Sequence, residues 1–412
     1  MKLTLLLIVI LAVPTTVSAD VVTDWNAITV QATLTANRPG PSNVIDIAIV
    51  HAAIYDAVQA IEKKSAPYYV EIPGASGSPI AAAAKAAHDI LVNRFPAQAS
   101  SLTPMYQQYL SSHGLTESDP GVAVGEKAAA GIIALRACDG SFPAQAAAPF
   151  VGSTAIGVWR PTPPANLAMA APWLGNVTPF TLTRPSQFRS EPPPALTSRE
   201  YAKDYNEVKV VGALNSSVRS AAQTDAAQFY AGNTPVIWNR ALRDIAITHV
   251  HDVGDSARLF ALVNMAVADA LISSWNDKNH YVFWRPITAI REGDNDGNPE
   301  TIGDPGWLSL NTTPNYPDYT SGANNFASAV TTMLEHFFET DHMTFSITTT
   351  NVGPTVQDTR TYHRFSDAAQ DVVDARVYSG IHFRFADEAA RKQGRQVAHW
   401  TFKNFLRPLS KR

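Results

Sequence analysis

Six stretches of the sequence repeat apolar residues with the period of an α-helix, and this pattern limits the fold more than any other feature. In the stretch 43–64, for example, Ile45, Ile49, Val58 and Ile61 fall near one helical face, as expected for a helix that packs against a core. The other five stretches are 78–95, 121–140, 256–278, 322–338 and 365–380. Strand-like alternation is scarce by comparison. We therefore expect an all-α fold in which many helices form a bundle.

The segment between about 141 and 200 has a different character, because prolines interrupt it repeatedly in "WRPTPPANLAMAAPWLGNVTPFTL" and "SEPPPALTS". Each proline removes a backbone donor and biases the preceding residue toward extended structure, so the segment cannot form a regular helix. It also contains Trp159, Trp173, Phe180 and Phe188, which makes it too aromatic for a flexible linker. We expect an ordered wrap that packs on the bundle and helps to close a pocket.

The chain has 412 residues, of which 45% are hydrophobic and 17% are charged. This is enough to bury a sizeable core in one large domain. We expect that domain to cover 20–412, with N-terminal helices over 43–140, the Pro-rich segment over 141–200 and a C-terminal bundle over 220–408.

The N-terminus has the layout of a secretory signal peptide. Lys2 precedes an apolar stretch over 3–13, and a small residue, Ala19, marks a cleavage point. The apolar stretch is well short of the roughly 20 residues that span a bilayer. We therefore predict that residues 1–19 are a signal peptide and that the mature protein is secreted or periplasmic, with no membrane anchor.

The net charge and the cysteine count exclude further classes of binding partner and covalent crosslink. A formal net charge of -4 without long single-sign runs gives no electrostatic footprint for nucleic acid or for an anionic membrane surface. Cys138 is the single cysteine, so the chain has no internal disulfide. The longest later apolar stretch, 259–275, is broken by Asp269, and we expect a buried helix there.

Three segments in the C-terminal part concentrate unusual chemistry, and the first is "WNDKNHYVFWRPIT" at 275–288. Lys278 and Arg285 are seven residues apart, which on a helix is nearly two whole turns, so both cations are expected on one face. Pro286 then stops the helix. Two cations in so apolar a stretch either pair with carboxylates, for which Asp277 is a candidate, or bind an anion.

The second segment is "PDYTSGANNF" at 317–326. Thr320 and Ser321 favour the N-cap of a helix, and Gly322 lets the backbone approach a ligand closely. The N–H groups of such a helix start suit an anion. Ala323, however, stands where a reactive side chain would be useful.

The third segment, "DARVYSGIHFRFADEAA" at 374–390, contains Arg376 and His382. On one unbroken helix their side chains would point about 120° apart, so a bend at Ser379-Gly380 is needed to bring them together. Two guanidinium groups, one ammonium group, backbone N–H groups and a neutral imidazole would together form a pocket for a tetrahedral oxyanion.

This spacing resembles the signature of a known group of enzymes. Lys278, six residues and Arg285-Pro286, then Ser321-Gly322, then Arg376, five residues and His382 are similar to the motif shared by vanadium-dependent haloperoxidases and acid phosphatases of the phosphatidic acid phosphatase type 2 superfamily. The similarity to the soluble bacterial haloperoxidase branch extends over 50–62, 159–180 and 283–389.

The resemblance implies the helical bundle of these enzymes and a role for each matching residue. Lys278, Arg285, Ser321, Gly322 and Arg376 would bind the oxygens of vanadate or phosphate. Lys278 would also polarise bound peroxide. His382 would be the axial vanadium ligand, or in a phosphatase the nucleophile. Vanadate would be the cofactor of a peroxidase, and a phosphatase would need none.

The chain departs from the family pattern at one position. The family has Pro-Ser-Gly-His where this chain has Thr320-Ser321-Gly322-Ala323. The absent histidine is the acid–base group, and losing such a group typically lowers a rate by about 10² to 10⁴. His280 and His363 are the candidates to take its place.

The resemblance and this departure together favour an exported vanadate-dependent peroxidase that uses hydrogen peroxide to oxidise a halide or an organic sulfide. Peroxide chemistry can draw on the metal as a Lewis acid, whereas phosphoester cleavage needs a proton for a poor leaving group. An acid phosphatase and a non-catalytic oxyanion-binding protein remain the alternatives. The expected partners are hydrogen peroxide, a halide and a small organic acceptor.

Overall fold

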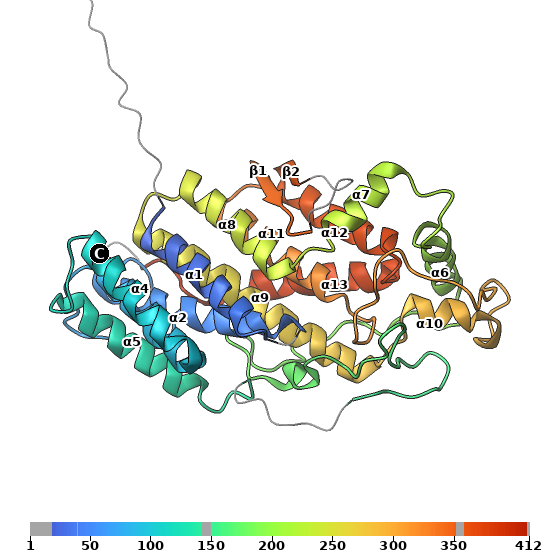
Figure 1. Ribbon diagram of the computed structural model, residues 1–412, viewed down its shortest axis with the longest axis horizontal. Helices are drawn as coiled ribbons and strands as arrows, with labels where there is room; N and C mark the ends of the chain where they lie inside the picture. The colour runs from blue at the N-terminus through green and yellow to red at the C-terminus, as the bar shows by residue number, and fades with distance from the viewer. Residues whose placement is uncertain (1–18, 39, 142–149, 352–357, 410–412) are drawn as a thin grey trace, which may run out of the picture.

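The computed structural model describes residues 19–38, 40–141, 150–351 and 358–409, and helices dominate this part of the chain (Figure 1). Its α-helices are α1 (Val21–Thr35), α2 (Asn43–Glu62), α3 (Pro79–Arg94), α4 (Ala99–Ser112), α5 (Pro120–Arg136), α6 (Arg199–Val211), α7 (Ala221–Phe229), α8 (Thr234–His249), α9 (Val253–Tyr281), α10 (Pro286–Arg291), α11 (Gly322–Phe338), α12 (Phe365–Tyr378) and α13 (Arg384–Asn404). Strands β1 (His342–Thr348) and β2 (Thr359–Arg364) form an antiparallel hairpin. The predicted all-α fold is confirmed. The predicted signal peptide lies almost wholly outside the described residues.

Helix α9 runs through the middle of the molecule and carries the first half of the site. It packs against α2 on the N-terminal side and against α11 and α13 on the C-terminal side (Figure 1). Both α2 and α9 are long and apolar enough to cross a membrane, but 89% and 94% of their apolar windows are buried inside the protein. They are core helices, as predicted for the stretch 259–275.

Each of the six periodic stretches contains a helix, and α11 begins and ends where its pattern does. The periodicity did not indicate α13, which is strongly amphipathic but rich in charged residues. Nor did it indicate α1, α4, α6, α7, α8 and α10. It also did not indicate the hairpin of β1 and β2, whose strands expose much of their surface.

The described part of the Pro-rich segment, 150–200, packs along α9 as predicted. Its backbone carbonyls accept hydrogen bonds from α9 side chains: Ala170 O from Trp275 Nε1 at 3.2 Å, Gly175 O from Asn276 Nδ2 at 2.8 Å and Pro172 O from Asn279 Nδ2 at 2.9 Å. Residues 142–149 lie outside the described part. The wrap therefore supports the helix that carries Lys278.

Asp269 of α9 binds the wrap through four hydrogen bonds. Its buried carboxylate accepts the backbone N–H groups of Phe180 (2.6 Å), Thr181 (2.7 Å) and Leu182 (3.1 Å). The Thr181 hydroxyl donates to it as well, at 2.6 Å. These donors replace the water that the carboxylate loses on burial, although burial still raises the pKa of Asp269 above its ordinary value.

We predict that Asp269→Ala destabilises the protein, because it leaves three buried N–H groups without an acceptor. Each unsatisfied buried group costs about 1–3 kcal/mol, so the free energy of unfolding in urea should fall by at least about 2 kcal/mol. Limited proteolysis should then cut first within 150–200. Asp255→Ala, an exposed acid on the same helix, should stay within about 0.5 kcal/mol of wild type. Equal effects of the two substitutions would contradict the assigned role.

Candidate functional site

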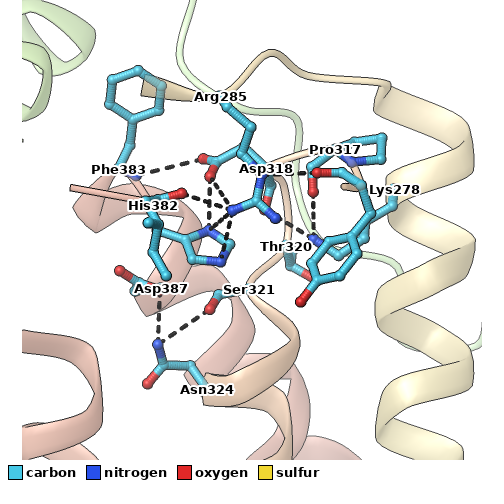
Figure 2. A network of polar contacts seen from close by, with 12 residues as sticks. Lys278, Arg285, Pro317, Asp318, Thr320, Ser321, Asn324, His382, Phe383 and Asp387 are labelled. Carbon is cyan, nitrogen blue, oxygen red and sulfur yellow. Dashed lines mark hydrogen bonds and ion pairs between the residues drawn. The ribbon is translucent and has the colours of Figure 1, made fainter. Parts of the chain in front are cut away.

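Lys278 lies fully buried near the C-terminal end of α9. Its Nζ donates to the carbonyl oxygens of Pro317 at 2.6 Å and Asp318 at 3.0 Å (Figure 2). Since an ammonium group has three N–H bonds, one remains for a ligand. Burial, together with the charge of Arg285, lowers the pKa of Lys278 well below its ordinary value.

Arg285 does not share a helix with Lys278, and this corrects the prediction for 275–288. Helix α9 ends at Tyr281, where Val282 takes the left-handed conformation with φ of 46°, and Arg285 is the N-cap of α10. Pro286 begins that helix rather than ending the previous one. A proline suits the first position of a helix and disfavours helical backbone before it. The two cations therefore converge through a turn.

The Arg285 side chain is held by backbone oxygens. Its Nε donates to Tyr316 O at 2.8 Å, and its Nη1 donates to Ile381 O at 2.7 Å. Its Nη2 is buried without a hydrogen-bond partner among the described residues. A buried guanidinium nitrogen without an acceptor is unusual in a folded protein, and it marks a place for an anion.

Ser321 is the N-cap of α11, but its side chain does not cap the helix. The first backbone N–H groups of α11 therefore keep their capacity to bind an acceptor. Gly322 is required for packing, because a Cβ there would lie 2.9 Å from the Trp275 ring. The helix start predicted at 317–326 is confirmed, and the Ser321 Oγ accepts a hydrogen bond from Asn324 Nδ2 at 3.3 Å.

Arg376 and His382 are brought together by the predicted bend. Helix α12 ends at Tyr378, and Gly380 has φ of +76°, a conformation that favours glycine. Arg376 Nη2 donates to Tyr230 O at 2.5 Å, while its buried Nε has no partner among the described residues. His382 then lies 3.1 Å from Arg285 Nη1 through its Nε2.

Asp318 joins these groups and was missed by the sequence reasoning. Its fully buried carboxylate lies 2.7 Å from His382 Nδ1 and 3.4 Å from Arg285 Nη1 (Figure 2). Burial raises the pKa of Asp318 to about 7, against the opposing charges of Arg285 and Lys278. The cations of 275–288 thus have a carboxylate partner, but it is Asp318. Asp277 pairs with Arg189 instead.

His382 is a neutral imidazole in this setting. Burial, followed by the charges of Arg285, Lys278 and Arg376, lowers its pKa well below the ordinary value of 6.5. Asp318 accepts a hydrogen bond from Nδ1–H, which places the lone pair on Nε2. A neutral imidazole oriented by a carboxylate is the form that coordinates a metal.

A cavity of about 280 Å³ opens onto these groups. Arg376 and His382 line it beside an apolar wall to which Trp275, Ala323 and Phe326 contribute. Lys278, Arg285 and Ser321 lie buried behind the wall. None of the residues 150–200 lines the cavity, so the described part of the wrap does not close it.

The two histidines proposed to replace the absent imidazole lie elsewhere. His280 is exposed at the end of α9, with its ring against Tyr281. His363 is exposed on β2, where its Nδ1 lies 3.0 Å from Thr344 Oγ1. Neither lines the cavity, so the geometry supports neither as the acid–base group.

Comparison with known proteins agrees with this geometry. Residues 258–411 match the family model of the VCPO second helical-bundle domain. Among curated proteins, vanadium chloroperoxidase of Curvularia inaequalis is 33% identical over 201 residues, covering 41% of this chain and 32% of that protein. The C-terminal part of the chain is therefore similar to vanadium haloperoxidases. Its match spans about a third of the length of this curated haloperoxidase.

Solved haloperoxidase structures share the fold over nearly the whole chain. The crystal structure of the first bacterial vanadium-dependent iodoperoxidase superposes with a TM-score of 0.80 at 23% identity, covering 95% of this chain and 97% of that one. A holo-type bacterial vanadium-dependent chloroperoxidase gives 0.71 at 17% identity, covering 95% and 93%. Identities this low establish the haloperoxidase fold, and the roles of single residues stay predictions.

The donor set fits the oxyanion that the haloperoxidase family name implies. Arg285 Nη2 and Arg376 Nε are buried without a partner among the described residues, and the α11 N-terminus lacks a side-chain cap. His382 supplies a neutral nitrogen. Vanadate would take its oxygens to these donors and its metal to His382.

We predict that Arg285→Ala weakens the binding of inorganic phosphate and of vanadate. Losing a hydrogen bond to a charged group costs about 1.5–3 kcal/mol, which corresponds to about a 10- to 100-fold rise in Kd. Isothermal titration calorimetry would measure this change. Arg160→Ala is the matched control, because Arg160 pairs with Glu292 at 2.9 Å outside the cavity. Unchanged affinity in Arg285→Ala would exclude this residue from the anion site.

Proposed function

We propose that this chain is a vanadate-dependent peroxidase of the haloperoxidase type, which oxidises a halide or an organic sulfide with hydrogen peroxide. The observation that carries the proposal is that Arg376 and His382 line the cavity, while the buried cations Lys278 and Arg285 lie close enough to lower the pKa of His382. The similarity of the C-terminal part to vanadium haloperoxidases supports the same activity.

Each side chain of the site would have a separate role, either in binding the anion, in binding the metal or in orienting the metal ligand. The guanidinium groups of Arg285 and Arg376, the Lys278 ammonium and the α11 N–H groups bind the oxygens of the anion. His382 Nε2 holds the metal, while Asp318 fixes the imidazole through Nδ1. Vanadate, when bound, supplies a Lewis-acidic centre that activates peroxide for attack by a halide.

Burial strengthens each of these contacts. Lys278, Arg285 and Asp318 are fully buried, so their charges act in a medium of low dielectric constant. The cavity wall formed by Trp275, Ala323 and Phe326 offers apolar surface to an organic acceptor. A phosphatase is less well supported, because no carboxyl group and no second histidine lines the described cavity to protonate a leaving group.

The deciding experiment measures both chemistries in one preparation. Vanadate-loaded protein should brominate or iodinate a phenolic dye with peroxide, and the vanadate-free protein should leave an aryl phosphate essentially unhydrolysed. His382→Ala should lower halogenation at least about 100-fold, since the metal ligand is lost. His113→Ala is the control, because His113 is exposed at the end of α4.

Other outcomes identify the alternatives. Phosphate hydrolysis that depends on His382 would indicate the acid phosphatase. Tight oxyanion binding without turnover in either assay would indicate the non-catalytic binder.

We also propose that the protein is exported. The support is the pattern of Lys2, the apolar stretch 3–13 and Ala19. Intact mass of the protein recovered from outside the cytoplasm should correspond to a chain that starts at Asp20. A full-length mass in the cytoplasmic fraction alone would refute export.

A further inference from the structure

A second buried carboxyl, Asp387, lies beside the oxyanion site and has no role in the proposed function so far. It sits in the first turn of α13 and is fully buried. Its Oδ1 accepts a hydrogen bond from Asn324 Nδ2 at 2.7 Å (Figure 2). Its Oδ2 has no hydrogen-bond partner among the described residues. Such an unsatisfied buried oxygen calls for an explanation.

The Ser321 hydroxyl connects Asp387 to the anion site. It leaves the α11 N-terminus uncapped and lies near the Asp387 carboxyl, whose charged form it stabilises. Asn324 Nδ2 also donates to Ser321 Oγ, at 3.3 Å, and Ser321 N donates to Ala386 O at 3.1 Å. The Ser321 hydroxyl therefore lies beside Asp387, at the N-cap of α11, whose N-terminus faces the proposed anion site.

Burial and a neighbouring charge favour the protonated form of Asp387. Burial raises its pKa well above the ordinary value, and the charge of Asp318 adds to this; Ser321, Arg376 and Asn324 oppose the shift. Lys278 and Arg285 are the other charged groups near this carboxyl. Burial therefore favours the protonated carboxyl, and nearby cations stabilise the carboxylate when the proton leaves.

We propose that Asp387, acting through the Ser321 hydroxyl, holds the proton that the bound oxyanion receives, in place of the imidazole absent at Ala323. The inference rests on the proposed function, whose acid–base group it identifies. In the step, the Ser321 hydroxyl gives its proton to an oxygen of the anion while Ser321 Oγ takes the proton of the Asp387 carboxyl. No electrons are transferred, and a carboxylate remains for the next proton.

The other buried carboxyl is less suited to this task. Asp318 Oδ1 faces both His382 Nδ1 and Arg285 Nη1, and its Oδ2 faces the N–H group of Phe383 at 3.5 Å. Its contacts orient the imidazole. Asp387, by contrast, has an oxygen without a hydrogen-bond partner among the described residues and the Ser321 hydroxyl nearby, at the N-cap of α11.

Asp387→Asn tests the proposal, since an amide keeps the shape and cannot release a proton. Vanadate-loaded Asp387→Asn should lose about 10² or more in turnover, while its Kd for vanadate stays within about threefold of wild type because the anion-binding cations are intact. Asp204→Asn is the matched control: Asp204 is also buried and accepts the N–H group of Phe385 at 2.7 Å beside the same end of α13, without contacting Ser321.

The same substitution made in an Ala323→His protein separates a role in proton supply from a structural role. In Ala323→His, an imidazole occupies the position where the family carries its acid–base group. Asp387→Asn should then cost at least about tenfold less turnover than it does in the wild-type background. An equal loss in both backgrounds, or an unaltered turnover in the wild-type background, would overturn the proposal.

Proton linkage gives a readout that does not depend on turnover. Binding of inorganic phosphate, titrated calorimetrically at one pH in two buffers of different ionisation enthalpy, reports the protons exchanged with solvent. Asp387→Asn should take up as much as about one proton more than wild type, since the internal source is gone. Asp204→Asn should match wild type. If vanadate-loaded wild type binds the anion but oxidises no halide, the peroxidase proposal fails. In that case, a higher proton uptake by Asp387→Asn than by wild type still supports the role of Asp387, and an equal uptake rejects it.

Discussion

The site depends on burying three cationic side chains around one point, and Asp318 makes this tolerable. Charges removed from water are expensive unless they are paired and hydrogen-bonded. Asp318 contacts Arg285 and His382 through its carboxylate and Lys278 through its carbonyl oxygen. One residue thus partly neutralises the cluster and fixes the imidazole. The remaining positive charge is left to attract an anion.

This balance explains why the site is built from turns between helices. Arg285 follows the break after α9, Ser321 precedes α11, and His382 follows the glycine bend after α12. An aromatic cluster that includes Tyr201, Phe283 and Phe383 packs behind these turns, so they are rigid although irregular. Backbone carbonyls at the turns then become acceptors for buried cations, which a regular helix could not offer.

The sequence contained much of this arrangement, but not all of it. Helical period located α9 and α11, and the glycine at 380 indicated the bend that brings Arg376 to His382. The prediction that Lys278 and Arg285 share one helix is wrong, because Pro286 begins α10 and does not end α9. Asp318 and Asp387 were missed for another reason. Carboxylates in polar-looking segments are mostly solvated, and only the tertiary packing buries these two. The signal was present in part: Asp318 stands three residues before Ser321, within the segment whose helix start indicates an anion site.

The attachment of the wrap to α9 has an evolutionary consequence. Ala170, Pro172 and Gly175 are held by their carbonyl oxygens, and Phe180 to Leu182 by their N–H groups. Every residue type except proline offers both groups, so at these positions the contact hardly depends on the side chain. Drift in the wrap sequence is therefore compatible with an unchanged path, provided that the polar side chains of α9 persist. Relatives of this chain can therefore differ at Ala170 and Pro172 and still support Lys278 in the same place, whereas Gly175 is fixed because a Cβ there would lie 2.7 Å from the α9 backbone.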